Sequence, residues 1–93
     1  MIIARLIIEF YLPGCSSLKE KRYILRSLRD KLRNKFNVAF CETRFQDKWQ
    51  RSEFCIVTVA NSRRGLDSLV QSVITFLETS PGLICTDIER EYL

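Results

Sequence analysis

The residues best suited to chemistry in this chain are cations that recur every three or four positions. At this spacing they share one face of a helix predicted over residues 17–36. That segment holds eight Lys or Arg against two acids, a net charge of +6, while the whole chain carries +4. Such a cationic face can bind a polyanion, above all nucleic-acid phosphates. The positions concerned are Lys19, Arg22, Arg26, Arg29 and Arg33.

The cationic face also has a plainer interpretation, because Lys and Arg are good helix formers that keep a solvated face soluble. A solvated face usually mixes charges, whereas these positions include no acid. Lys19, Lys21 and Arg22 lie in the first turn, where the helix dipole disfavours cations. Both interpretations stay open. The binding one also predicts phosphate contacts from Lys21 and, at the start of a second helix, from Arg63 and Arg64.

The start of this helix carries a capping motif. Ser17 can act as N-cap and Glu20 follows three residues later, as in a capping box. A small anion held by the first helical amides and the nearby cations is the functional alternative. Apolar residues on another face predict the packing side, namely Leu18, Leu25, Leu28, Leu32 and Phe36.

The pattern of apolar residues predicts strands over residues 1–12, 37–45, 52–61 and 83–93, and a second helix over 62–78. The order βαββαβ predicts one α+β domain over residues 1–93. Its economical form is a ferredoxin-like sandwich, with an antiparallel sheet of order 4-1-3-2 and both helices on one face. This topology places residues 13–22 beside the hairpin 46–51. It also places Arg63 and Arg64 near Arg33 and Lys35.

The open face of the sheet is a second candidate surface. The even-numbered residues of the first strand should face the helices, which leaves Ile3, Ile7 and Tyr11 on the open side. The middle strands are assigned to that side through Val38, Phe40, Phe54 and Ile56, with a register uncertain by one residue. So much exposed apolar surface would favour a homodimer formed through the sheet.

Composition argues against several classes of protein. The chain has no histidine, and its four cysteines are scattered, so no metal and no cofactor is predicted. Cys41 and Cys55 would lie close in one strand register, where a disulfide could form. The N-terminus lacks the basic region and cleavage site of a signal peptide, and no segment could span a membrane. A cytoplasmic location is therefore expected.

Two further positions have competing interpretations. Cys15 lies in the loop where acylphosphatases of this architecture bind a phosphoryl group, but their arginine-bearing loop pattern and a histidine base are absent. No catalysis is therefore predicted, and acylphosphatase-like chemistry is the weakest alternative. Trp49 could stack on a base or anchor a partner. Packing over the edge of the core is favoured instead, since tryptophan is mostly buried.

Several motifs together resemble the YlxP-like family of small bacterial proteins, a domain of unknown function. They are Ser17-Leu18-Lys19-Glu20-Lys21-Arg22, then Phe36-Asn37-Val38 leading to Glu42, then Gln46-Asp47 with Trp49-Gln50-Arg51. The resemblance implies a ferredoxin-like fold and no established catalytic residue. Family members are often encoded beside translation and ribosome-maturation factors, which directs the basic helix toward structured RNA or a ribosomal subunit. The resulting hypothesis is a non-catalytic RNA- or ribosome-associated module, with the homodimer as alternative.

Overall fold

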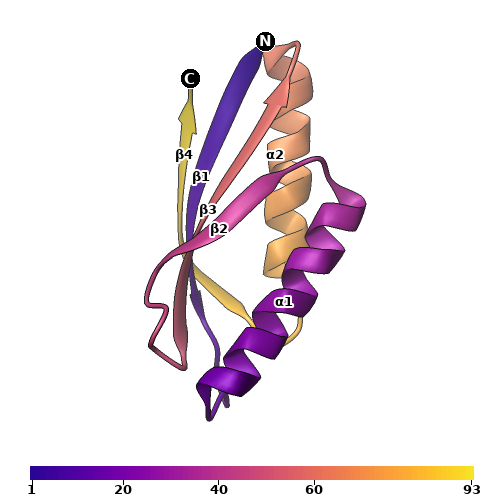
Figure 1. Cartoon of the computed structure of the whole chain (residues 1–93). Helices are drawn as coiled ribbons and strands as arrows, with labels where there is room; N and C mark the ends of the chain where they lie inside the picture. Colours follow the sequence, from indigo (N-terminus) through magenta and orange to yellow (C-terminus); the bar gives the residue numbers. More distant parts are fainter.

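The computed structural model describes residues 1–93 and has the predicted order of elements. They are β1 (Ile2–Tyr11), α1 (Leu18–Lys35), β2 (Ala39–Arg44), β3 (Arg51–Ala60), α2 (Arg63–Glu78) and β4 (Ile84–Tyr92). The strands form one antiparallel sheet in the order β2-β3-β1-β4, which is the predicted order read from the other edge. Both helices lie on one face of the sheet (Figure 1). The predicted ferredoxin-like α+β fold is confirmed.

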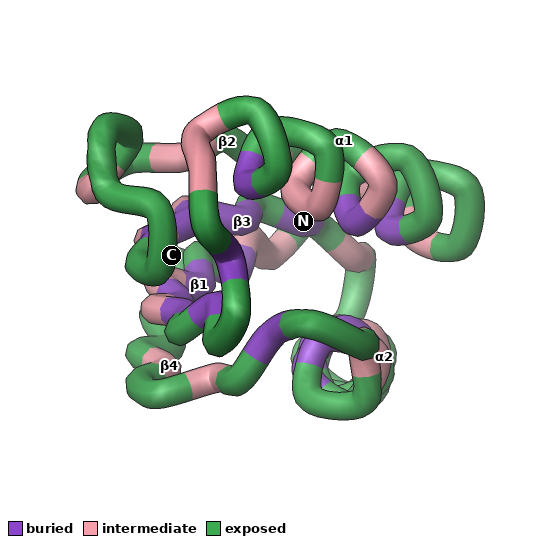
Figure 2. The backbone as a smooth tube through the Cα atoms, turned by 90° about the horizontal axis from the view of Figure 1, so that it is seen from below, coloured by how far each residue is buried: buried purple, intermediate pink, exposed green.

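The central pair of strands sets the two faces of the sheet. β1 pairs with β3 without interruption, from Ile2 opposite Ala60 to Tyr11 opposite Arg51. Opposite residues of an antiparallel pair point to the same side. Because Leu6 and Ile8 of β1 are buried under the helices, their partners in β3 are buried with them. The core therefore lies between the sheet and the helices, where Figure 2 shows the buried segments.

The prediction for the middle strands was wrong by one residue. Phe54 and Ile56 lie in the core, and Val38 and Phe40 pack against it. The physical reason is the register, since Phe54 lies opposite Ile8, whose side chain faces the helices. The open face carries instead a mixture of half-exposed apolar residues and the ion pairs Arg5–Glu91 and Arg51–Glu9. Its apolar members include Ile3, Ile7, Cys55, Val57 and Val59.

Serine caps begin both helices. Ser17 Oγ accepts from the amide of Glu20 at 3.0 Å, and Ser62 Oγ accepts from the amide of Gly65 at 3.1 Å. The Glu20 carboxylate accepts from the amide and hydroxyl of Ser16, whereas in a standard capping box it would accept from the amide of the N-cap residue, Ser17. The acidic half of the capping box is therefore displaced by one residue. Neither helix has the apolar length that crossing a lipid bilayer requires.

Candidate nucleic-acid interface

Four arginines of α1 line a groove between this helix and the edge strand β2. We call Arg22, Arg26, Arg29 and Arg33 the arginine row; all four are exposed. The groove has a volume of about 340 Å³, and β2 contributes Phe40, Cys41 and Glu42 to its wall. The guanidinium carbon of Arg33 lies 6.0 Å from the ring centre of Phe40. One turn of helix separates successive arginines, so the row faces the groove along its length.

Few acidic side chains lie near the arginine row, so most of its positive charge is not neutralised. Arg29 lies 3.7 Å from the carboxylate of its neighbour Asp30, with both side chains largely exposed. The other three arginines form no ion pair. Glu42 is the acid in the groove wall, and it is already engaged by Lys21 and Ser52. The α1 side of the groove is therefore a row of positive charges that faces a largely apolar wall of β2 and β3.

Lys21 does not belong to this surface, which corrects the prediction that it contacts phosphate. Its side chain is only 1% exposed. The Nζ donates to the carbonyl oxygen of Phe45 at 2.6 Å and lies 3.0 Å from Glu42 Oε2. The spacing of Lys21, Leu28 and Leu32 explains the burial, because steps of seven and four residues keep one helical face. That spacing was visible in the sequence.

The sequence analysis assigned no structural role to the partners of Lys21, although Glu42 is among the motif residues. Glu42 Oε2 also accepts from Ser52 Oγ at 2.6 Å, which satisfies both charges below the surface. Phe45 has a φ of 66°, in the left-handed region, and its carbonyl faces the lysine. One signal existed: Phe40 and Glu42 alternate in β2 on the same inward face, where an acid needs a partner.

The helix start is occupied by its own side chains. The Ser17 hydroxyl oxygen accepts a hydrogen bond from the amide of Glu20, and the Glu20 carboxylate accepts from both the amide and the hydroxyl of Ser16. Lys19 is exposed and makes no ion pair. The first turn therefore supports the capping interpretation of residues 17–22.

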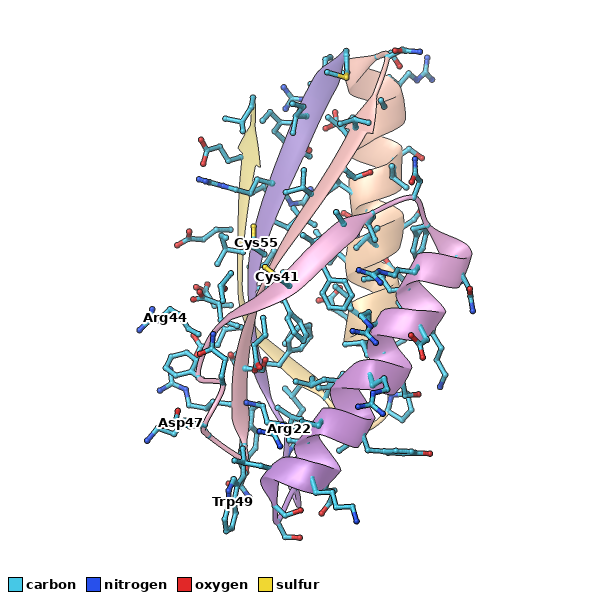
Figure 3. The ribbon with its side chains drawn as sticks, in the orientation of Figure 1. Arg22, Cys41, Arg44, Asp47, Trp49 and Cys55 are labelled. Atoms are coloured by element: carbon cyan, nitrogen blue, oxygen red, sulfur yellow. The ribbon has the colours of Figure 1, made fainter.

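The two motif stretches meet at one end of the molecule, as the topology predicted. Gln50 Nε2 donates to the carbonyl oxygen of Cys15 at 3.3 Å, and the amide of Leu12 donates to Gln50 at 2.9 Å. Lys21 connects the same hairpin to α1 through Phe45. Figure 3 shows Arg22 and Trp49 at this lower end of the fold.

Arg63 does not extend the arginine row, which corrects the second topological prediction for that residue. The end of α1 meets the last turns of α2, where Lys35 lies 5.4 Å from the ring centre of Phe76. Arg63 lies thirteen residues earlier in α2, about 20 Å away along the helix axis. Its guanidinium stacks 3.6 Å over the ring of Tyr92 in β4 and pairs with Asp67. Arg64 is exposed beside it.

The hairpin between β2 and β3 presents Trp49 to solvent. Its side chain is 52% exposed, so the prediction that it packs over the core edge was wrong. Asp47 and Lys48 make no ion pair, whereas Arg51 is held by Glu9 and lies over the ring of Phe45. The Gln46 amide donates to the Glu42 carbonyl at 3.4 Å. A pocket of about 570 Å³ beside the hairpin is lined by Tyr11 and by residues 47–51.

Cysteines 41 and 55 lie opposite each other in the β2–β3 register, as one of the alternatives predicted, and both thiols are free. Burial, and next the neighbouring Cys41, raise the pKa of the Cys55 thiol. Burial also raises the pKa of Cys85 to about 11. Cys15, in the loop that precedes α1, is buried in the core.

Comparison with known proteins places this architecture in a family. A model described as "Protein of unknown function (DUF503)" matches residues 3–90. The chain belongs to the DUF503 family. It is 38% identical over 84 residues to the uncharacterized protein YlxP of Bacillus subtilis strain 168. The aligned segment covers 90% of this chain and 91% of YlxP. The predicted resemblance to the YlxP-like family is therefore confirmed over nearly the whole chain.

Proposed function

We propose that this DUF503 protein is a non-catalytic module that binds RNA through the arginine row. The observation that carries the proposal is the set of four exposed guanidinium groups on one groove, with almost no acid to neutralise them. Guanidinium is always charged and presents a planar fork of donors that matches phosphate oxygens. Free arginines held in one line are therefore suited to successive phosphates of a nucleic-acid backbone.

The dimensions of the row support contact with several phosphates. Arg22 and Arg33 are eleven residues apart, so the row is about 16 Å long. A nucleic-acid strand presents phosphates repeatedly over that length. Contacts of this kind position a ligand without reading its sequence. Structured RNA, as found in a ribosomal subunit, is the ligand class that we propose.

The proposal assigns no chemical step to the protein. Cys15, the one nucleophile considered at the loop before α1, is 2% exposed, and its Sγ lies 3.5 Å from the carbonyl oxygen of Ser17. A substrate would have to displace that packing before it reached the thiol. The binding interpretation needs no such rearrangement, since the arginine row is already open to solvent.

The test is the salt dependence of RNA binding. Fluorescence anisotropy of labelled structured ribosomal RNA should show a log–log slope against salt of about −0.7 to −0.9 for each phosphate neutralised. Replacement of the four row arginines by Gln should weaken binding and lower the magnitude of the slope by roughly one for each phosphate contact removed. Each row arginine is also replaced alone and compared with Arg64→Gln, which is the matched control because it likewise removes one exposed arginine, outside the groove.

Two results would overturn RNA binding by the row. One is the absence of binding by the unmodified protein at low salt. The other is equal affinity and slope for the protein that lacks the four arginines. Binding that falls equally in the Arg64→Gln control would show a general charge effect rather than a surface on α1.

A homodimer through the open sheet face is the second candidate. Ile3 lies opposite Val59, and Val57 and Val59 are each exposed by about two fifths. This small apolar group would be covered if two sheets packed face to face. Light scattering should then give twice the chain mass of 11.0 kDa, and Val59→Lys should restore the single-chain mass. A single-chain mass for the unmodified protein at high concentration would reject this dimer.

A further inference from the structure

The pocket at the β2–β3 hairpin has the walls of a stacking site. Tyr11 and Trp49 contribute its two aromatic rings, which are 40% and 52% exposed. Neither ring takes part in an aromatic pair or lies under a cation, unlike Phe45 beside Arg51. Both rings therefore keep a free face. The pocket of about 570 Å³ beside them is shallow and open to solvent, so a planar ligand can reach both rings.

The pocket is held in place by contacts on three sides. Gln50 is hydrogen-bonded to the chain before α1, through its side chain and its carbonyl. Arg51 is paired with Glu9, and Lys48 closes the turn by donating its amide to Phe45 at 3.0 Å. Tyr11 ends β1 directly opposite Arg51. The aromatic rings are thus presented by a braced hairpin, so stacking would require little ordering of the chain.

The polar groups of the pocket suit a nucleotide. Lys48 is exposed and has no ion partner, so its ammonium group can contact a phosphate. Asp47 is also free and can accept a hydrogen bond from the exocyclic amino group of a base. An aromatic wall next to one free cation and one free acceptor offers partners for the base and for the phosphate of a nucleotide. A purely anionic ligand would use only the lysine.

The pocket lies at the Arg22 end of the arginine row. Lys21, the neighbour of Arg22, is bonded to Phe45 at the start of the hairpin, and Gln50 is bonded to the loop before α1. Figure 3 shows Arg22 and Trp49 at the same end. A strand whose phosphates follow the row toward Arg22 would therefore leave the groove at the end of the fold that carries the hairpin and its two aromatic rings.

We propose that the Tyr11–Trp49 pocket stacks an unpaired base of the RNA whose backbone contacts the arginine row. This inference rests on the proposed function and narrows it, because a base held inside a duplex has no free face to offer. The preferred ligand is then RNA with a single-stranded segment or loop. Stacking of this kind tolerates any base, since every base has a π-face.

The single tryptophan of the chain makes the pocket directly observable. Trp49 fluorescence should be quenched when a single-stranded RNA of about ten nucleotides saturates the protein. An abasic oligomer of the same length has the same backbone charge and should bind by anisotropy without that quenching. Tyr11→Ala and Trp49→Ala should each weaken binding of the base-bearing RNA by about tenfold, with the abasic oligomer unaffected.

Two variants serve as controls. Tyr23→Ala removes a tyrosine that is 74% exposed in a different groove, between α1 and the end of α2, and should bind as the unmodified protein does. Trp49→Phe keeps a stacking ring and should keep most of the affinity. Circular dichroism of each variant should match the unmodified protein, since Tyr11 and Trp49 lie outside the core.

Failure of the pocket and failure of RNA binding are distinguishable. Salt-dependent RNA binding without a change in Trp49 fluorescence, or equal quenching by the abasic oligomer, would overturn the stacking site and leave the arginine row intact. Saturable quenching by adenosine monophosphate but not by ribose 5-phosphate, together with no binding of longer RNA, would show a base-binding pocket and overturn the RNA-binding row on which the proposal rests. Equal quenching by an acidic peptide such as polyglutamate would show that the site does not require a nucleobase, and would reject the proposal.

Discussion

Lys21 Nζ lies 3.0 Å from Glu42 Oε2, and this buried ion pair connects α1 to the edge strand β2. Ser52 donates to the same carboxylate oxygen, and Phe45 accepts the second hydrogen bond of the lysine. The cation that looked like one more phosphate ligand is therefore a structural connection. It holds the hairpin against the first turn of the helix and so sets the relation between the two candidate surfaces.

The first prediction concerns this ion pair. Lys21→Met should lower the free energy of unfolding by about 3 kcal/mol, because it leaves the Glu42 carboxylate without its cation. Lys21→Met combined with Glu42→Gln should recover part of the loss, since the unpaired charge is then gone. Urea denaturation measures both values. A loss below about 1 kcal/mol for the single variant would show that the pair contributes little.

The second prediction concerns the packing of α1. Leu32 is fully buried, whereas Leu25 is half-buried beside the arginine row. Leu32→Ala should destabilise the protein by about 3 kcal/mol through lost burial and a cavity, and Leu25→Ala by clearly less. Equal losses in urea denaturation would mean that α1 packs through a different face.

The third prediction concerns pH. The Tyr92 hydroxyl first, and then the Arg63 guanidinium, lower the pKa of Asp67. A carboxyl with a lowered pKa in the folded chain stabilises the fold above its unfolded pKa, and this contribution is lost as pH falls through the folded value. Asp67→Asn should therefore lower Tm at pH 7. The difference should shrink as the solution is acidified below pH 3.8, and a difference independent of pH would contradict the assignment.

The fourth prediction concerns thiol reactivity. Iodoacetamide at pH 8 should label Cys41 first, because it is exposed. With its pKa raised from 9.0 to about 11, Cys85 has about 100-fold less thiolate at that pH than an unperturbed thiol. The raised pKa of Cys55 slows its labelling, and burial protects Cys15. Mass spectrometry would measure the rate at which each cysteine is labelled. The differences between these rates should vanish in denaturant. Equal rates for Cys41 and Cys85 in the folded protein would contradict it.

Local patterns were enough to predict the elements and the topology. The even-numbered residues of β1, the serine caps and the spacing of Leu28 and Leu32 all depend on interactions within a few residues. Those interactions follow from backbone geometry, so a sequence displays them directly. The arginine row belongs to the same class, because exposure on a helix follows from its periodicity.

The assignments that failed depend on contacts between distant residues. Phe54 and Ile56 face the core because β3 aligns with β1 in one register, and a shift of one residue would reverse the face. Arg63 lies on Tyr92 rather than beside Arg33, because the end of α1 packs near Phe76 in α2 and not near the start of that helix. Trp49 is exposed because its hairpin extends beyond the core.

The sequence by itself determined the βαββαβ order, the two helical faces and the concentration of positive charge on residues 17–36. Only the tertiary structure decided which of those charges is free. Lys21 and Arg22 are adjacent and both cationic, yet one is buried on Glu42 and the other faces the groove. The physical reason is that burial of a charge depends on a partner, and here the partner of Lys21 lies 21 residues away, in strand β2.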